Sequence, residues 1–484
     1  MSFKKKLTDA YNQKVTKPDD YQEIELRVPV KKTHHYLFTS IKISAIVAAS
    51  LVGVLILTAG GFILASSMHT TESTKSIKKA RFSVYDTNLA KSETFKTLNN
   101  ITYSEEKEYN QIDNEFVNKV NTFAANSFVN FDKNGNLAYS PLMLYTQLDL
   151  ISLAVSDDQT QEQFDNALLS NDSNFRASNI NKAMRNNFFV NQTLKSTVQA
   201  KNAVFIEEKL GADPAFVEGL TARRAEAYEL NFQDDKDVQN ILNWASQSVN
   251  EDDFLKKEDL EIQIDTAMMF LSSLYFDNTW SSKFKTQDTK VDDFYLSNSE
   301  TIQTKFMNHA YYGQVDEYEK YVAVTDYYNS SYSIQYFVPK DTKDSIFDIL
   351  PNNFLDKKEE SNHYMVSLSL PKFAITSQCK LNEVVEKLGV TNPYVKYSNH
   401  LKRAFQDADS LVYSYLVYTK QKTTVSFDED GTVVKSITFS MGAAGKAGPM
   451  RGGYEVKLNQ PFVYCIRDGS GLPLLVGTVT NPLG

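Results

Sequence analysis

The feature that most constrains this chain is an apolar stretch near its N-terminus. Residues 43–65 (ISAIVAASLVGVLILTAGGFILA) contain no Asp, Glu, Lys or Arg. A helix rises ~1.5 Å per residue, so a helix of this length would cross a hydrocarbon core ~30 Å thick. The apolar part of a signal peptide is shorter and follows a short basic start, whereas this stretch follows residues 1–42. We therefore predict an uncleaved transmembrane helix, with cleavage near residues 65–67 as the alternative.

The charges on either side of this helix predict its orientation. Residues 1–42 carry nine Lys and Arg against five Asp and Glu. Basic residues also lie beyond the helix, at positions 75–81, so the positive-inside bias is small. We expect a cytoplasmic N-terminus and a large extracellular C-terminal part, as in a single-pass protein of the cell membrane. The lipid bilayer is then one partner of the chain, through residues 43–65.

The rest of the chain divides by composition. Residues 1–42 are polar and mixed in charge, which predicts a flexible cytoplasmic tail. Residues 66–109 are rich in Ser, Thr, Lys, Asn and Glu, which predicts a flexible tether. Residues 110–484 have the composition of a folded domain throughout, without an internal repeat or a second linker.

Hydrophobic periodicity predicts helices early in this domain and strands late in it. The expected helices cover residues 112–128, 142–154, 160–169, 214–228 and 238–249. The expected strands cover residues 263–275, 302–307, 321–325, 332–339, 364–373, 413–427, 454–458, 462–467 and 474–481. This separation predicts an α+β fold with large antiparallel or mixed sheets.

Charge and motifs exclude several classes of function. The net charge of −9 argues against nucleic acid as a partner, because phosphate binding needs a basic surface. Two cysteines cannot form a four-thiolate zinc site or a disulfide framework. The chain contains no HExxH, CxxC or GxSxG motif, so we predict no metal site, no cofactor and no catalytic residue.

The most distinctive motif lies at the C-terminus. Residues 461–468 (PFVYCIRD) are followed by residues 474–482 (LLVGTVTNP). This pair resembles the C-terminal signature of the serpins, a buried hairpin that ends in a Gly-x-Val-x-Asn-Pro turn. Other serpin-like blocks occur in the family's order, at residues 136–141 (NLAYSP), 202–206 (NAVFI), 274–276 (LYF) with Trp280 and Phe284, 370–373 (LPKF), 381–389, 404–405 and 428–432 (DEDGT). The resemblance covers residues 110–484.

The resemblance implies both a fold and a function. The fold has N-terminal helices, a large central β-sheet, further sheets and an exposed reactive loop. The function is that of an inhibitor of a serine (or cysteine) protease, which cleaves the loop and is trapped as a covalent acyl-enzyme. The cleaved loop then inserts into the large sheet. A serpin is not an enzyme and has no catalytic residues of its own.

The same resemblance places the hinge of the reactive loop at Glu429, Gly431, Thr432, Val434, Ser436 and Thr438. In an inserted strand, alternate side chains face the core. The inward set would be small or compact: Thr432, Val434, Ser436, Thr438, Ser440 and Gly442. The outward set would hold the only charge: Val433, Lys435, Ile437, Phe439 and Met441. This alternation favours insertion, because a slip of one residue would bury Lys435.

Two departures from the family pattern leave a second function open. Residues 433–435 (VVK) stand where the family has a run of small residues. Met143, Ser272 and Gln421 replace the usual polar residues in the region where the sheet parts. The alternative is therefore a non-inhibitory serpin-fold binding protein whose loop is cleaved as a substrate.

The bait bond also has several candidates. Family spacing from Thr432 puts Gly445 just before the cleaved bond, and one residue of slack makes Lys446 the bait for a trypsin-like enzyme. Met450 and Arg451 are further candidates. Residues 443–445 would instead suit a protease that prefers small side chains. We favour Lys446.

Overall fold

The computed structural model describes residues 96–131, 135–297, 300–341, 344–356, 361–408, 411–435 and 451–484. The predicted tail (1–42), the predicted transmembrane helix (43–65) and residues 66–95 of the predicted tether lie outside these ranges and stay predictions. Within these ranges, no helix is both long enough and apolar enough to cross a membrane.

The longer helices begin at side chains that accept hydrogen bonds from the first turn. The N-cap residues of α4 to α9 are Asp113, Ser140, Asp157, Asp172, Asp213 and Asp234, and each accepts a backbone N–H. Such caps satisfy donors that a helix leaves unpaired. The helices are α4 (Asn114–Phe128), α5 (Pro141–Ser152), α6 (Asp158–Ala167), α7 (Ser173–Asn186), α8 (Pro214–Ala222), α9 (Asp235–Val249), α10 (Ile346–Ile349) and α11 (Asn382–Lys387).

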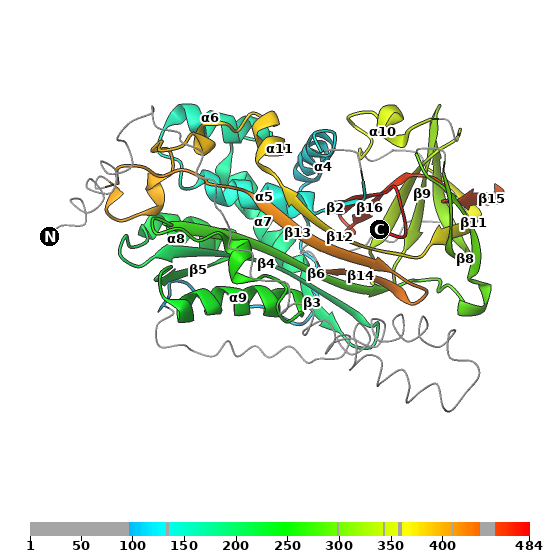
Figure 1. Ribbon diagram of the computed structural model, residues 1–484, viewed down its shortest axis with the longest axis horizontal. Helices are drawn as coiled ribbons and strands as arrows, with labels where there is room; N and C mark the ends of the chain where they lie inside the picture. The colour runs from blue at the N-terminus through cyan, green and yellow to red at the C-terminus, as the bar shows by residue number, and fades with distance from the viewer. Residues whose placement is uncertain are drawn as a thin grey trace, which may run out of the picture. The chain divides into compact units, whose positions relative to one another are not determined.

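One large mixed sheet, called the first sheet here, contains the hinge region (Figure 1). Its strand order is β1-β5-β4-β6-β14-β13-β12, and β3 pairs with β4. The bounds are β1 (Lys96–Thr97), β3 (Phe188–Asn191), β4 (Ser196–Glu207), β5 (Ala225–Leu230), β6 (Met268–Thr279), β12 (Phe373–Lys380), β13 (Lys420–Phe427) and β14 (Gly431–Lys435).

The second sheet is built mostly from the C-terminal half of the chain. Its order is β15-β11-β8-β9-β10-β16-β17-β2, and β7 pairs with β8. The bounds are β2 (Leu137–Tyr139), β7 (Lys290–Tyr295), β8 (Thr301–Glu317), β9 (Tyr321–Tyr327), β10 (Ser333–Pro339), β11 (Asn362–Pro371), β15 (Arg451–Lys457), β16 (Phe462–Arg467) and β17 (Pro473–Val479). The predicted α+β class with large mixed sheets is confirmed.

The first sheet is covered on both faces, and the sequence of β4 shows how. Val204 and Ile206 belong to the main hydrophobic core with residues of α5, whereas Ala203 and Phe205 pack with Trp244 of α9. Alternate residues of a strand point to opposite faces. A strand that is apolar at successive positions therefore belongs in the middle of a three-layer arrangement (Figure 1).

Two sequence predictions are wrong in this domain. The helix predicted over 214–228 ends at Ala222, and β5 (Ala225–Leu230) follows it. The predicted flexible tether ended at residue 109, but its last part, residues 96–109, packs against the domain. Asn99 Nδ2 donates to the Ala225 carbonyl at 2.9 Å, and Asn99 Oδ1 accepts from the Ala227 N–H at 2.9 Å. Polar composition concealed this segment, although Leu98 packs against the main core and the Tyr103 ring contacts Phe188.

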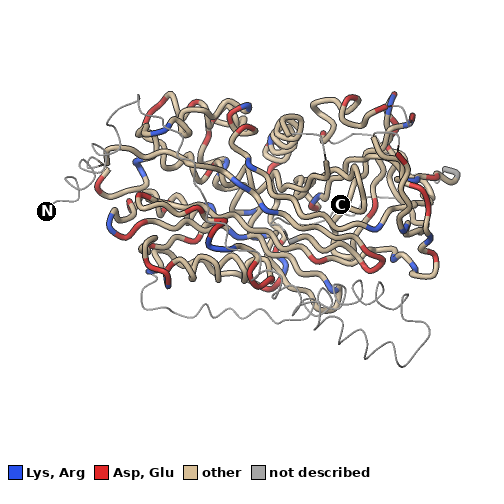
Figure 2. The backbone as a smooth tube through the Cα atoms, viewed as in Figure 1, with Lys and Arg blue, Asp and Glu red and all other residues tan. Residues whose placement is uncertain are grey.

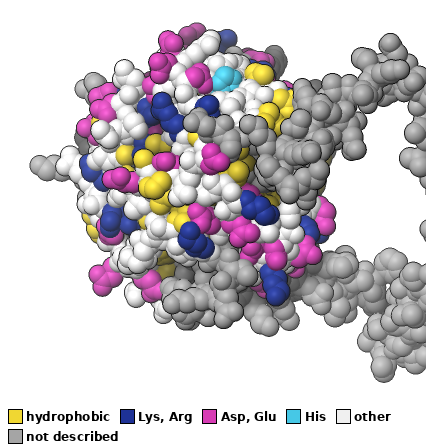
Figure 3. Space-filling model, turned by 90° about the vertical axis from the view of Figure 1, so that its left-hand side faces the viewer, with side chains coloured by type: hydrophobic (Ala, Val, Ile, Leu, Met, Phe, Trp, Pro, Cys, Tyr) yellow, Lys and Arg dark blue, Asp and Glu magenta, His cyan; other side chains and the backbone are white. Residues whose placement is uncertain are grey.

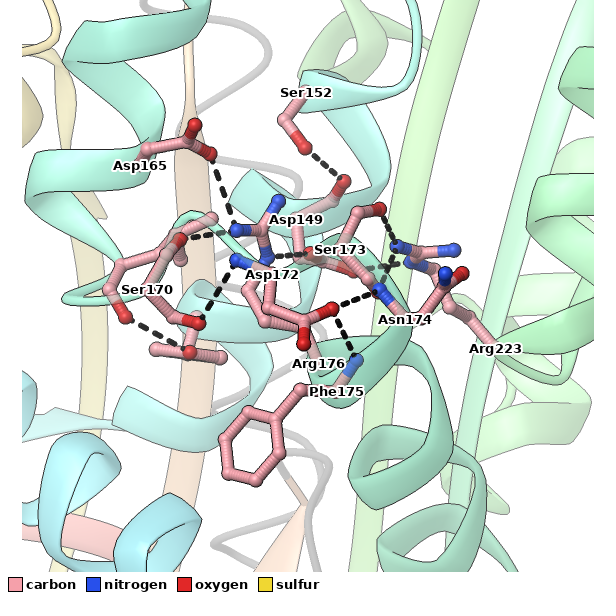
Figure 4. Close-up of polar contacts among 12 residues, drawn as sticks. Asp149, Ser152, Asp165, Ser170, Asp172, Ser173, Asn174, Phe175, Arg176 and Arg223 are labelled. Carbon is pink, nitrogen blue, oxygen red and sulfur yellow. Dashed lines mark hydrogen bonds and ion pairs between the residues drawn. The ribbon is translucent and has the colours of Figure 1, made fainter.

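Basic and acidic residues are interspersed along the described backbone (Figure 2). One charged cluster is buried among the helices (Figure 4). Asp149 of α5 is fully buried and binds both Arg176 of α7, at 2.5 Å, and Arg223, which follows α8. Arg223 also donates to Ser173 Oγ at 2.7 Å. A buried charge is tolerated only when partners satisfy it, so Asp149 fixes three helices relative to one another.

We predict that Asp149→Ala lowers the free energy of unfolding by about 3–5 kcal/mol, because it removes the buried carboxylate that the two buried guanidinium groups share. Asp165→Asn is the matched control, since Asp165 is partly exposed and contacts only one of the two arginines. Urea denaturation measures both. A loss below about 1 kcal/mol for Asp149→Ala would contradict the importance of this cluster.

The packed N-terminal segment carries one buried amine. Lys107 Nζ donates to the Ser330 carbonyl at 2.7 Å and lies 4.2 Å from the ring centre of Phe189. Burial lowers the pKa of Lys107 from 10.5 to about 7, although Asp468 opposes the shift. Above pH 7 the folded chain has released a proton that the unfolded chain keeps until about pH 10, so the stability due to this group rises with pH.

We therefore predict that Lys107→Met flattens the rise in stability between pH 7 and pH 9. The measurement is the urea midpoint at several pH values. Lys209→Met, at a largely exposed position, is the control and should keep the slope of the parent chain. An unchanged slope in Lys107→Met would show that this amine is not the group that titrates.

Candidate functional site

The turn between β13 and β14 returns the chain into the first sheet. Asp428 Oδ1 accepts the N–H groups of Asp430 and Gly431, at 3.0 and 3.1 Å. Trp280 Nε1 donates to the Asp428 carbonyl at 2.9 Å. Short acidic side chains favour such turns because they bind the backbone that follows them. The turn thus directs β14 back alongside β13.

Strand β14 lies between β6 and β13 and pairs with both. Val434 is opposite Phe276 of β6 and Val425 of β13, and the pairing is antiparallel on both sides. The predicted hinge residues Gly431, Thr432 and Val434 therefore form a central strand of the sheet rather than an exposed segment.

Gly431 is required by the close approach of two backbones. A Cβ atom at this position would lie 2.0 Å from the Asn278 carbonyl oxygen and 2.8 Å from Thr279 Cα. No real Cβ contact is that short, so any side chain would push β14 away from β6. The glycine lets the hinge enter the sheet at its first residue.

The side chains of β14 alternate as a central strand requires. Thr432 and Val434 are fully buried, and Val434 belongs to the main core. Val433 faces the opposite side and is 7% exposed. The branched hinge residues are therefore packed within the sheet.

An aromatic pair lies beneath the hinge. Tyr328 Oη and Thr432 Oγ1 are 2.7 Å apart, within hydrogen-bond distance. The Tyr328 ring stacks on Trp280, with centroids 4.7 Å apart, and meets Phe276 of β6 edge-on. This contact binds the one hydroxyl of the hinge strand to the core, where an unpaired hydroxyl would be costly.

Glu429 anchors the outer end of the turn. Its carboxylate accepts from Lys372 Nζ at 2.6 Å and from Thr289 Oγ1 at 2.9 Å. Burial by itself would raise the pKa of Glu429, but these hydrogen bonds outweigh it and hold the pKa below its usual value. Glu429, a predicted hinge residue, thus links the turn to Lys372 and Thr289, the residues directly before β12 and β7.

Beyond β14 the sheet is open. Among the strands that the structure describes, none pairs with residues 268–274 of β6 on the side that faces β13. We call the space between residues 268–274 and residues 413–423 the slot. Gln147 of α5 donates to the Phe270 carbonyl at 3.0 Å, and Ser140 N donates to Gln421 Oε1 at 2.6 Å. Helix α5 therefore lies behind the slot and satisfies part of its polar edge.

Several predicted site residues lie outside the described part of the chain. These are Ser436, Thr438, Gly445, Lys446 and Met450, which stay predictions. Arg451 is the first residue of β15, which pairs in parallel with β11. The residues at which the sheet parts are in the described part: Met143 is buried in α5, Ser272 lies on the open edge of β6, and Gln421 makes the contact given above.

Sequence reasoning missed the residues that hold the hinge. Tyr328 and Lys372 were not predicted to contact it, because each is far away along the chain. Lys372 does lie in the serpin-like block 370–373, but nothing in that block indicates an acidic partner at Glu429. Only the folded topology brings these residues together.

A family model described as serpin (serine protease inhibitor) matches residues 118–482. The chain belongs to the serpin family. The resemblance inferred from the sequence is thereby confirmed, and so is the serpin-like architecture. The predicted transmembrane anchor, residues 43–65, lies outside the described residues and stays a prediction.

Known serpins are similar to this chain over most of its folded part. Serpin-Z4 of Hordeum vulgare is 26% identical over 372 residues, which cover 72% of this chain and 90% of that protein. Alpha-1-antiproteinase S of Cavia porcellus is 23% identical over 361 residues, which cover 72% of this chain and 85% of that protein. Among solved structures, the thermophilic serpin tengpin in its native state has a TM-score of 0.63, with 24% identity, 80% of this chain covered and 100% of tengpin. Human thyroxine-binding globulin also has a TM-score of 0.63, at 17% identity. The match covers 76% of this chain and 99% of that protein. These structural likenesses show the fold alone.

We predict that Gly431→Val withdraws β14 from the sheet, because its side chain would collide with the Asn278 backbone. Hydrogen exchange of the amides in 432–435 should rise about tenfold or more. Gly453→Ala is the matched control, since the nearest atom to its Cβ is 3.9 Å away. Unchanged exchange in Gly431→Val would contradict the close approach of β14 and β6.

Proposed function

We propose that this serpin inhibits a serine (or cysteine) protease by inserting its cleaved reactive loop into the first sheet, and that it is not itself an enzyme. The observation that carries the proposal is the position of β14. Its residues 432–435 pair with both β6 and β13, and Gly431 pairs with β6. The slot continues in the same direction without a described strand in it. A loop released by cleavage could extend β14 into this space and gain backbone hydrogen bonds on both sides.

The protease supplies the catalytic groups for the trapping reaction. Its serine hydroxyl adds to the carbonyl carbon of the bait residue, and the peptide C–N bond breaks. The amine of the next residue leaves with a proton, and an ester joins the serine oxygen to the bait residue. Insertion of the loop then has to be faster than hydrolysis of this ester by water. The hinge makes loop insertion faster because its first residues already lie in the first sheet.

The hinge composition supports insertion. The sequence has Val433 and Val434 where the family has small residues, and such bulk would slow insertion if it did not fit. Val434 is fully buried beside Val425, and Val433 is nearly so. Since β-branched side chains favour strands, these two residues stabilise the inserted hinge.

The bait residue proposed here is Lys446, with Gly445, Met450 and Arg451 as the other candidates. Cleavage after Lys446 breaks its bond to Ala447 and makes a trypsin-like protease the target. We also propose that residues 43–65 anchor the chain in the cell membrane. The N-terminus would then be cytoplasmic, and the serpin domain would be extracellular and face proteases outside the cell.

A second candidate function is a non-inhibitory binding protein whose loop is cleaved as a substrate. The observation that favours it is the interaction of Ser140 with Gln421 at the slot. These hydrogen bonds join helix α5 to β13 and would have to adjust as a strand enters. A sheet that resists opening would let the protease finish hydrolysis and leave.

Mixing the full chain with trypsin distinguishes the two functions. Inhibition predicts a band of combined mass that survives denaturation, and a released peptide that begins at Ala447. Lys446→Ala should slow complex formation about tenfold or more, whereas Arg451→Gln, the control, should not change it. A protease that lacks its catalytic serine should form no such band.

One result would count against the inhibitory proposal, and another would change the bait residue. If trypsin cleaves the loop and leaves free, and the cleaved chain melts where the intact chain does, the binding function is the better account. If Arg451→Gln abolishes the complex and Lys446→Ala does not, the bait is Arg451.

A further inference from the structure

One end of the domain carries a concentration of exposed apolar side chains. Eleven large hydrophobic residues are exposed in the described part of the chain, and five of them lie within residues 264 and 395–417. We call these five the apolar patch: Ile264, Val395, Tyr397, Val412 and Val417. Soluble domains seldom gather exposed apolar side chains in this way unless the surface meets a partner.

Three separate segments come together to form the apolar patch. Tyr413 Oη donates to Asp265 Oδ2 at 2.6 Å, which joins the segment before β6 to the segment before β13. The Tyr397 ring meets the rings of Tyr413 and Tyr415 edge-on, with centroids 5.5 and 5.9 Å away. Figure 3 faces this end of the domain and shows hydrophobic side chains among basic and acidic ones. The patch is therefore one surface and not a set of scattered residues.

The described chain begins at the same end of the domain. Lys96 of β1 is opposite Glu229 of β5, which is in register with Ile206 of β4. Ile206 is in turn opposite Met268, the first residue of β6. The hinge lies at the other end of β6, where Gly431 is opposite Thr279. The chain thus enters the domain beside the apolar patch, at the end that is distant from the reactive loop.

We propose that the apolar patch docks on the surface of the lipid bilayer in which residues 43–65 are anchored. The inference rests on the proposed membrane anchor and deepens it, because it assigns an orientation to the domain. The hinge end would face away from the bilayer, where an extracellular protease can reach the loop.

The length of the predicted tether favours this occupant. Residues 66–95 separate the predicted membrane helix from Lys96, and a flexible chain of that length spans roughly 30 Å on average. The hinge end of β6 lies roughly 36 Å beyond its first residue, so the tether holds the patch end closer to the bilayer. Docking within one tethered molecule takes place at a high effective concentration, and a small apolar surface is then sufficient.

The side chains of the apolar patch suit the boundary between water and lipid. Aliphatic side chains enter the acyl region, and tyrosine rings prefer the level of the headgroups. The nearby charges are balanced, since Lys420 pairs with Glu261 and Lys396 Nζ lies 5.0 Å from the Tyr397 ring centre, close to the segment that contacts Asp265. Docking should therefore depend on apolar contact and not on anionic lipid.

Docking also has to be reversible. Insertion along the slot carries an attached protease from the hinge end toward the patch end of the domain, so the bilayer must leave room for it. A patch of five side chains, without an excess of basic charge, suits weak contact of this kind.

The test uses the full chain reconstituted in phosphatidylcholine vesicles, with the fluorescence of one added tryptophan as the readout. Val395→Trp puts the probe in the apolar patch. Val291→Trp is the matched control, because Val291 is equally apolar and 59% exposed but lies on β7 of the second sheet. Lipids brominated in the upper acyl chain should quench the fluorescence added by Val395→Trp about twofold or more, and should leave that added by Val291→Trp unchanged.

A second substitution tests the contribution of the patch itself. Ile264→Asp, made in the Val395→Trp chain, should abolish the quenching because it puts a charge against the acyl chains. Val291→Asp in the same chain should keep it. Salt at about 1 M should leave the quenching unchanged, since it screens charge but not apolar contact.

Three results would overturn the inference. Equal quenching in Val395→Trp and Val291→Trp would mean that the domain has no preferred orientation. Quenching that salt removes would mean that charge, and not the apolar patch, holds the domain. A shift in emission that follows protein density but not brominated lipid would assign the patch to a second copy of the chain.

Failure of the anchor is a separate result. If alkaline carbonate extracts the full chain from the vesicles, residues 43–65 do not span the bilayer and the proposed anchor fails. Quenching of Val395→Trp before that extraction would still support docking of the apolar patch, and its absence would contradict it. Trapping of trypsin by the chain in detergent tests the inhibitory function independently of both.

Discussion

The structure depends on the insertion of one short strand between two long ones. Strand β14 pairs with β6 and β13 at the same time, and this is possible because Gly431 has no side chain where the two backbones meet. Thr432, bound to Tyr328 beneath the sheet, fixes the face on which the strand enters. A loop that begins inside the sheet has already lost the conformational entropy of its first residues. Each further residue of insertion then gains hydrogen bonds on both sides.

The contacts around the hinge are of two kinds with different roles. Trp280, Tyr328 and Phe276 form an apolar platform that β14 covers. The Glu429 carboxylate, held by Lys372 and Thr289, fixes the turn from outside the core. Apolar packing favours insertion of any strand of the right shape, whereas the ion pair sets where the turn ends. Together they hold β14 in its register between β6 and β13.

The sequence predicted the parts of the fold that local patterns encode. The strongly apolar segments at 462–467 and 474–481 correspond to β16 and β17, and the Ser140-Pro141 start of α5 follows from capping chemistry. Strand β5 was missed because Ala225–Leu230 (AEAYEL) favours a helix. Its acidic residues have distant partners that a local pattern does not show: Trp244 donates to Glu226 at 2.6 Å, and Lys96 pairs with Glu229. Tertiary contacts outweigh propensity there. The contacts of Glu429 and Thr432 could not be predicted, because they join residues 57 and 104 positions apart.

The most direct test of this account is a crystal structure of the full chain after its loop has been cleaved. The account predicts that β14 extends as one continuous strand between β6 and β13, in the register that the hinge already has. A cleaved structure in which residues 268–274 of β6 remain without a neighbouring strand, with the loop outside the sheet, would contradict it.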